Sequence, residues 1–406
     1  MKKLDDQLLK KYAQIMVHYA LNNGKGINKG DTVFLVGQEC TKDLFIAIAN
    51  EIYLAGGNLI TNFTPDNLRE KSLVRLLLQN GSDDQISFFA KPYWHGIVEA
   101  TDHILFILSE PDIHYLEGIP ASRISMMNSA RAPYMKMREQ KEHAGKLSWS
   151  LCLYGTQSMA DEAGLSLDEY WEQIIEACYL RENDPVTKWK TVQRQIEEIK
   201  EKLDALEIET LHINGEDVDL HIQIGSNRKW LSGGGKNIPS FEIFTSPDWR
   251  GTNGTIRFNQ PLYYSGKRIS GISLRFENGV VVAFSATENE DALREMIAQE
   301  NADKVGEFSL TDKRHSRITK FMANTLFDEN MGGAYGNTHI ALGNAYKDTF
   351  TGDPSVVTEE QWAEMGYNSC PKVHTDIIST SDRTVTAQLR NKTEKVIYKN
   401  GQFTLD

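Results

Sequence analysis

The chain has 406 residues, of which 40% are hydrophobic and 25% charged, so it can bury a large core and is not a disordered segment. Its formal net charge of -12 repels phosphate backbones and so disfavours nucleic acid as a partner. The first residues contain two lysines without an apolar run, and no stretch approaches the roughly 18 apolar residues of a membrane span. We therefore expect a cytoplasmic protein with no signal peptide, no membrane partner and four reduced cysteines.

The first half of the chain alternates short apolar runs with helical patterns. The apolar runs indicate buried strands at 32–37, 58–63, 103–108 and 149–154. Helical periodicity is expected at 42–54 and 167–179. Buried strands separated by helices indicate a parallel sheet that is covered on both faces. We therefore predict an α/β domain with a mostly parallel sheet over residues 1–185.

A polar helix, expected at about 186–206, leads into a half with a different pattern. Alternating or clustered apolar residues there predict strands at 210–214, 219–224, 255–258, 273–276 and 280–284. Asn278-Gly279, between the last two strands, is typical of a hairpin turn. His212 and His221 alternate with apolar neighbours, as exposed strand positions do. We predict a β-rich α+β domain over residues 186–406.

Two histidines of this second half lie in settings that suit metal ligation. In the segment 373–377, β-branched residues favour a strand, so His374 and Asp376 project side by side from one face. An imidazole beside a carboxylate is half of a metal site, although an ordinary polar strand face has the same pattern. His339 lies among small residues in a glycine-rich stretch, where a packed loop with a satisfied histidine is the alternative.

Two glutamates lie in short apolar runs, Glu242 within 239–245 and Glu307 within 305–310. A carboxylate in such a run is paired, protonated or bound to metal, and for either residue alone a buried salt bridge is the alternative. Together with His339, His374 and Asp376, they provide the oxygen and nitrogen donors of a two-metal hydrolase. The chain has no HExxH motif, so a single-zinc helix site is excluded.

Five segments resemble, in order and approximate spacing, the motifs of the aminopeptidase T and aminopeptidase S family of metallopeptidases: 237–248, 303–307, 324–330, 338–346 and 374–376. The resemblance covers essentially the whole chain. It implies metal ligation by Glu242, Glu307, His339, His374 and Asp376, with Glu307 as the bridging ligand. It also places Tyr346 at the metal centre. Two departures bear on substrate preference: Phe241 stands where many relatives have an acid, and residues 335–338 enlarge the loop before His339.

The resemblance implies a homodimeric, metal-dependent aminopeptidase that acts on peptides with a free N-terminus. Its cofactors would be two divalent ions, and the donors suit Zn²⁺, Co²⁺ or Mn²⁺, with Mg²⁺ as a further option. We expect Tyr346 to ligate a metal or to stabilise the oxyanion, and Glu307 or Glu329 to accept the proton of the attacking water. Two alternatives stay open: another two-metal amide hydrolase, such as a dipeptidase or deacylase, and a metal-stabilised binding protein without catalysis.

Overall fold

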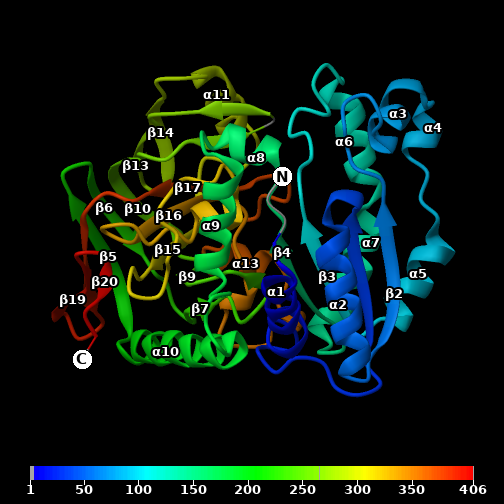
Figure 1. Cartoon of the computed structure of the whole chain (residues 1–406). Helices are drawn as coiled ribbons and strands as arrows, with labels where there is room; N and C mark the ends of the chain where they lie inside the picture. The colour runs from blue at the N-terminus through cyan, green and yellow to red at the C-terminus, as the bar shows by residue number, and fades with distance from the viewer. Residues whose placement is uncertain (1–3, 265, 406) are drawn as a thin grey trace. The chain divides into compact units, whose positions relative to one another are not determined.

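The structure, a computed structural model, describes residues 4–264 and 266–405 (Figure 1). The chain divides into two compact units, one of Met1–Thr191 with Gly234–Pro239 and one of Val192–Gly233 with Ser240–Asp406. That residues 1–185 and 186–406 are separate domains stays a prediction. Lys2 and Lys3, on which the expectation of no signal peptide partly rests, lie outside the described residues.

A five-stranded sheet forms the centre of the first unit. Its strand order is β2-β1-β3-β4-β8, and every pairing in it is parallel. The strands are β1 (Thr32–Gln38), β2 (Asn58–Thr64), β3 (His103–Leu108), β4 (Ser148–Leu153) and β8 (Asn237–Ile238). The first four correspond to the apolar runs expected from the sequence. The two-residue β8 comes from a later segment and is too short to show a periodicity.

Helices cover both faces of this sheet. On one face, Trp94 and Ile97 of α5 (Lys91–Ala100) pack against Phe34 and Ile104. On the other face lies α2 (Lys42–Leu54), drawn in front of the sheet in Figure 1. The remaining helices of the unit are α1 (Asp6–His18), η1 (Glu39–Thr41), α3 (Leu73–Asn80), α4 (Asp83–Ile86), α6 (Ala121–Ala130), α7 (Ala132–His143), α8 (Gln157–Glu162) and α9 (Leu167–Ala177). The predicted α/β architecture is confirmed.

The helix α10 (Pro185–Ala205) leads into the second unit, whose larger sheet is antiparallel with the order β14-β13-β10-β6-β5-β18-β19-β20. These strands are β5 (Ile208–Gly215), β6 (Val218–Gln223), β10 (Asp248–Arg257), β13 (Ser273–Glu277), β14 (Val280–Ser285), β18 (Arg383–Leu389), β19 (Glu394–Lys399) and β20 (Gln402–Phe403). Burial alternates along β6, as on a sheet with one exposed face. Asn278 and Gly279 both have positive φ, which confirms the expected hairpin turn.

A smaller antiparallel sheet, with the order β17-β16-β15-β9-β7, forms the core of the second unit. Its strands are β7 (Leu231–Ser232), β9 (Glu242–Thr245), β15 (Val305–Thr311), β16 (Asn337–Gly343) and β17 (His374–Ser379). Every residue of β15 and β16 is buried. The other elements are β11 (Leu262–Tyr264), β12 (Lys267–Ile269), α11 (Glu290–Ile297), α12 (Thr325–Asp328), η2 (Lys347–Thr349), η3 (Pro354–Val356) and α13 (Glu359–Glu364). The predicted β-rich second half is confirmed.

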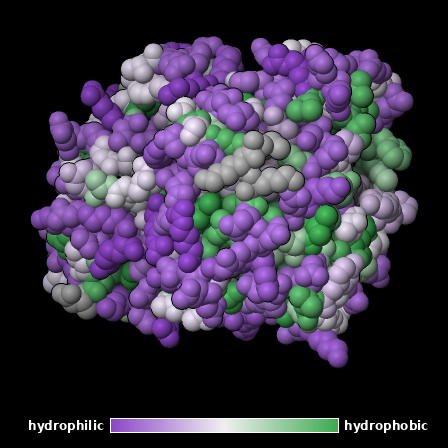
Figure 2. Space-filling model, viewed as in Figure 1, coloured by the Kyte–Doolittle hydropathy of each residue, from purple (hydrophilic) through white to green (hydrophobic). Residues whose placement is uncertain are grey.

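The surface and the cysteines agree with the composition. Hydrophilic residues cover most of the face shown in Figure 2, with hydrophobic residues scattered among them. Across residues 4–264 and 266–405, no helix has both the length and the apolar character needed to cross a membrane. All four cysteines are free thiols.

Candidate metal centre

The pairing register of the smaller sheet brings the predicted ligands of three strands to one face. Side chains alternate between the faces of a strand, and directly paired residues project to the same side. Ser309 of β15 pairs with His339 of β16, and Glu307 lies two residues before Ser309. On β17, Asp376 pairs with Ala341 and His374 pairs with Gly343, which lie two and four residues beyond His339 on β16. His374 and Asp376 therefore project from the same face of the sheet as His339. Four predicted ligands therefore share one face of the sheet.

Glu242 joins this face from the neighbouring strand β9. It pairs with Thr311, which lies two residues beyond Ser309 on β15 and therefore faces the same side. The hydroxyl of Ser309 donates a hydrogen bond to Glu242 Oε2 at 3.3 Å. Glu242 and Glu307 are almost fully buried, so neither carboxylate depends on bulk water for its partners.

The side chains converge around Glu307. Nε2 of His339 lies 3.4 Å from Glu307 Oε1, 3.5 Å from Glu242 Oε2 and 3.9 Å from Asp376 Oδ1. Nε2 of His374 lies 3.3 Å from Glu307 Oε2 and 3.7 Å from Asp376 Oδ1. The donor atoms form two groups of three, each group within 4.8 Å: one of Glu242, Glu307 and His339, the other of Glu307, His374 and Asp376. Glu307 belongs to both groups.

Burial and like charge shift the protonation of this cluster. Burial, followed by the repulsion of Glu307, raises the pKa of Glu242 to about 8, and burial also raises the pKa of Asp376. For Glu307 burial acts in the same direction, but hydrogen bonds from His339 and His374 outweigh it and lower its pKa to about 2. The pKa of each histidine rises to about 9, because its contact with Glu307 outweighs burial. The carboxylates are thus close enough to repel one another when ionised, and a bound cation would relieve this repulsion.

The donors fit a divalent metal ion in kind and in orientation. Nδ1 of His374 donates a hydrogen bond to the carbonyl oxygen of Asn344 at 2.7 Å. This bond keeps a proton on Nδ1, so that Nε2, once it loses its own proton, would offer its lone pair to a metal ion, as metal-binding histidines require. Within the described residues, Nδ1 of the buried His339 has no hydrogen-bond partner, so that ring is held through Nε2 alone. Carboxylate oxygens and imidazole nitrogens are the ligands that Zn²⁺ and related ions take.

The two further candidates, Tyr346 and Glu329, border this cluster. The ring of Tyr346 lies 4.6 Å from the ring of His374 and 5.5 Å from that of Phe244, measured between centroids. Partial burial and then the carboxylate of Glu307 raise the pKa of its hydroxyl well above the usual range. Glu329, at the end of α12, is buried, and burial followed by the repulsion of Glu242 raises its pKa well above the ordinary value. Burial thus favours the protonated form of both side chains when no metal is bound.

Asn330 is a residue of the site that the sequence analysis did not select. Its side chain is fully buried, with Oδ1 accepting a hydrogen bond from the backbone N–H of Phe241 at 2.6 Å. Its Nδ2 donates to the carbonyl oxygen of Leu326 at 3.0 Å and lies 3.3 Å from Glu329 Oε1. Asn330 thus ties the residue before Glu242 to the carboxylate of Glu329. The signal in the sequence is its place next to Glu329 within the segment 324–330.

Buried carboxylates and histidines that converge on a sheet face are typical of metal-dependent hydrolases. Comparison with known protein families identifies the class of protein: residues 5–403 match the thermophilic metalloprotease (M29) family. The chain belongs to this family and is a metallopeptidase, a hydrolase of peptide bonds. Family membership confirms the resemblance found in the sequence and implies a divalent metal.

Individual relatives match along nearly the whole chain. The protein is 27% identical to "Aminopeptidase AmpS" of Bacillus subtilis (strain 168) and 26% identical to "Aminopeptidase PepS" of Streptococcus thermophilus. Each alignment covers 98% of this chain and 98% of the relative. The solved structure of wild-type AmpT from Thermus thermophilus has the same fold, with a TM-score of 0.82 at 23% identity. That superposition covers 98% of this chain and 99% of the other.

Proposed function

We propose that this chain is an aminopeptidase whose metal centre holds two divalent ions through Glu242, Glu307, His339, His374 and Asp376. The main support for two ions is that the two groups of three donor residues in this cluster have Glu307 in common. A shared carboxylate is the usual bridge of a two-metal site, where the ions lie roughly 3.5–4 Å apart. Zn²⁺, Co²⁺, Mn²⁺ and Mg²⁺ all suit such donors. The aminopeptidase names of the relatives support the substrate class.

The chain's own residues supply the rest of the chemistry. Divalent ions held by these donors would polarise the scissile carbonyl and would lower the pKa of bound water. Tyr346 keeps its proton, since its pKa is raised well above the usual range. Its hydroxyl is therefore a hydrogen-bond donor for the oxyanion that develops on the scissile carbonyl. The rings of Phe244 and His374 pack beside Tyr346 and orient it.

Of the two candidate bases, Glu307 and Glu329, Glu329 is the better acceptor for the proton of the attacking water. Glu307 already contacts one histidine with each oxygen, and its lowered pKa of about 2 makes it a poor base. Glu329 has a raised pKa, so it accepts a proton more readily and can return it to the leaving amine. Asn330, bonded to Glu329 and to the N–H of Phe241, holds this carboxylate in place.

The surplus of carboxylates also suits a substrate with a free N-terminus. An α-amino group has a pKa of about 7.7–8.0, so at neutral pH it is largely an ammonium that needs an anionic seat. Either an ionised Glu329 or one of the bound ions would provide a seat for this amine, the ion binding it in the neutral form. Fixing the terminal amine next to the reacting carbonyl contributes strongly to rate.

We further propose that the protein is cytoplasmic and a homodimer. Four free cysteines, three of them buried, suit a reducing compartment. The dimer follows from the family resemblance, and light scattering after size-exclusion chromatography tests it. A mass near 45.9 kDa, the value of one chain, would contradict it.

Blocking the amine tests the aminopeptidase activity. Acetylation removes both the charge and the lone pair of the terminal amine. We expect leucine p-nitroanilide to be hydrolysed and acetyl-leucine p-nitroanilide to be inert, by comparison of kcat/KM. Similar values for the two would contradict an aminopeptidase and favour a deacylase or endopeptidase. No turnover of either, with metal restored, would favour a binding protein.

A further inference from the structure

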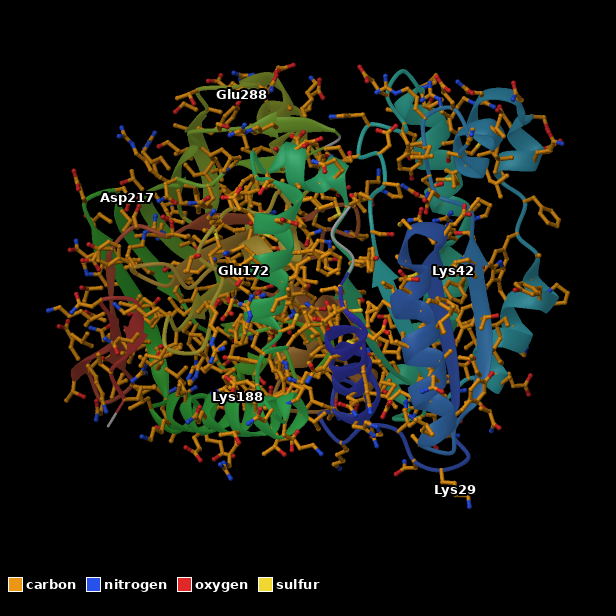
Figure 3. All side chains as sticks on the ribbon, in the orientation of Figure 1. Lys29, Lys42, Glu172, Lys188, Asp217 and Glu288 are labelled. Atoms are coloured by element: carbon orange, nitrogen blue, oxygen red, sulfur yellow. The ribbon has the colours of Figure 1, made fainter. Side chains whose placement is uncertain are left out.

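A second group of metal-ligand side chains lies outside the metal centre, on the hairpin formed by β5 and β6. The group consists of His212, Asp219 and His221, whose potential ligand atoms all lie within 4.8 Å of one another. Figure 1 labels the two strands, and Figure 3 labels Asp217 in the turn that joins them. The larger sheet carries this group, whereas the smaller sheet carries the metal centre.

The register of the hairpin places the three side chains on one exposed face. His212 pairs directly with His221, and Asp219 lies two residues before His221 on the same strand. The intervening Leu220 is buried, while Asp219 and His221 are exposed. Since strand side chains alternate between faces, this face of the hairpin is the solvent face.

The geometry shows that the side chains already approach one another. The rings of His212 and His221 stack at 4.2 Å between centroids with an interplanar angle of 5°. Nε2 of His212 lies 2.8 Å from Asp219 Oδ1. His212 is 38% exposed and Asp219 70%, so these side chains can adopt other staggered rotamers without displacing the core.

The surroundings favour a cation there. The residues paired with this group on the neighbouring strands are uncharged: Thr386 on β18, and Asn253 and Thr255 on β10. The nearest cation by register is the exposed Arg257, two residues beyond Thr255 on the same face of β10, and the ion pairs of the described residues include none between Arg257 and Asp219. Among these paired residues of the described sheet, no lysine or arginine therefore competes for Asp219.

We propose that His212, Asp219 and His221 bind a divalent transition-metal ion at the surface of the larger sheet. Two imidazoles and one carboxylate suit Zn²⁺, Ni²⁺ or Cu²⁺, and Cu²⁺ binds such donors most tightly. Water completes the coordination, because three protein ligands leave positions open. The ion links adjacent strands β5 and β6, so binding raises the free energy of unfolding of the hairpin. This site adds one ion per chain to those of the metal centre.

Counting bound ions on the full chain tests the proposal. Equilibrium dialysis against Zn²⁺ should give one ion per chain fewer for His221→Gln than for the natural sequence. Asp219→Asn keeps both imidazoles but removes the carboxylate, so the Kd of the variant for this Zn²⁺ ion should rise at least about tenfold. Even the loss of a residue that only hydrogen-bonds to a metal ligand lowers metal affinity by about 10–100-fold. Circular dichroism verifies that each variant is folded.

His95→Gln is the matched control, because His95 is an exposed histidine beside a carboxylate, 3.6 Å from Glu99, on another element. It should leave the ion count unchanged. Hydrolysis of leucine p-nitroanilide should stay unchanged in all three variants. An equal ion count and affinity for His221→Gln and the natural sequence would overturn the proposal. The count does not depend on turnover, so it separates this site from the proposed peptidase activity.

Discussion

Glu307 contacts both histidines of the metal centre, one with each carboxylate oxygen. A glutamine at this position keeps the shape of the side chain, but it removes the negative charge and replaces one oxygen with a donor. Loss of a principal electrostatic element of an active site costs about 10²–10³ in rate. We predict that Glu307→Gln lowers kcat/KM for leucine p-nitroanilide at least about a hundredfold.

The control is Glu277→Gln, at the last residue of β13 before the hairpin turn, where the glutamate is 56% exposed. This change should leave kcat/KM unaltered and the free energy of unfolding within about 0.5 kcal/mol. Equal losses of activity in the two variants would place the site elsewhere.

The protonation of the metal-free cluster predicts how stability depends on pH. Despite burial, contact with Glu307 raises the pKa of His339 and His374 from 6.5 to about 9. A raised histidine pKa contributes stability that is complete below pH 6.5 and is lost as the pH rises through about 9. Burial raises the pKa of Glu242 from 4.5 to about 8, so this residue lowers the free energy of unfolding progressively as the pH rises from about 4.5 to about 8. Both effects therefore lower the free energy of unfolding as the pH rises.

We predict that the Tm of the chelated protein falls as the pH rises from about 6.5 to about 9. Bound metal favours ionised carboxylates and neutral imidazoles, so the metal-loaded protein should show a smaller slope. Differential scanning calorimetry of both forms across this interval measures the effect. A Tm of the chelated form that rises with pH would contradict these protonation states.

At the scale of elements, the bulge in β15 sets the position of Glu307. The register between β15 and β16 shifts between Val305 and Glu307, where Gly306 lies. A Cβ at Gly306 would approach the carbonyl oxygen of Asn344 to 2.3 Å and that of Gly343 to 2.5 Å. Both obstacles are backbone, so they cannot move aside as a flexible side chain would.

We predict that Gly306→Ala displaces β15 from β16, weakens metal binding and lowers kcat/KM at least about tenfold, with a loss of stability of about 1–3 kcal/mol from overpacking. Gly96→Ala is the comparison, because a Cβ at Gly96 in helix α5 meets no atom within 4 Å among the described residues. That variant should be as active as the natural sequence and up to about 1 kcal/mol more stable. An active and stable Gly306→Ala variant would show that the bulge does not position the ligand.

Several elements could be predicted from the sequence because their signals are local. Four of the five strands of the parallel sheet follow from short apolar runs, and the hairpin at Asn278-Gly279 follows from turn chemistry. The same-face placement of His374 and Asp376 also follows from strand periodicity. The role of Asn330 does not, since its bond to the N–H of Phe241 joins residues 89 apart in the chain. Neither strand register nor such long-range hydrogen bonds leave a periodic signal.

At the scale of the whole molecule, metal binding and folding are linked. Ions that bind only the folded chain stabilise it, by about 2.7 kcal/mol per site when free metal is 100 times the Kd. We predict that a chelator abolishes hydrolysis of leucine p-nitroanilide and lowers the Tm, and that added Zn²⁺, Co²⁺ or Mn²⁺ restores both. Full activity in protein shown by elemental analysis to be free of metal would contradict a metal-dependent mechanism.

The central claim is that two ions share Glu307 on one face of the smaller sheet. Anomalous diffraction at the zinc edge, from crystals of the full chain grown with Zn²⁺, tests it most directly. At the smaller sheet we predict two peaks, one between Glu242, Glu307 and His339 and the other between Glu307, His374 and Asp376. Their separation should be roughly 3.5–4 Å. A single peak at these residues, or none, would contradict the two-metal account.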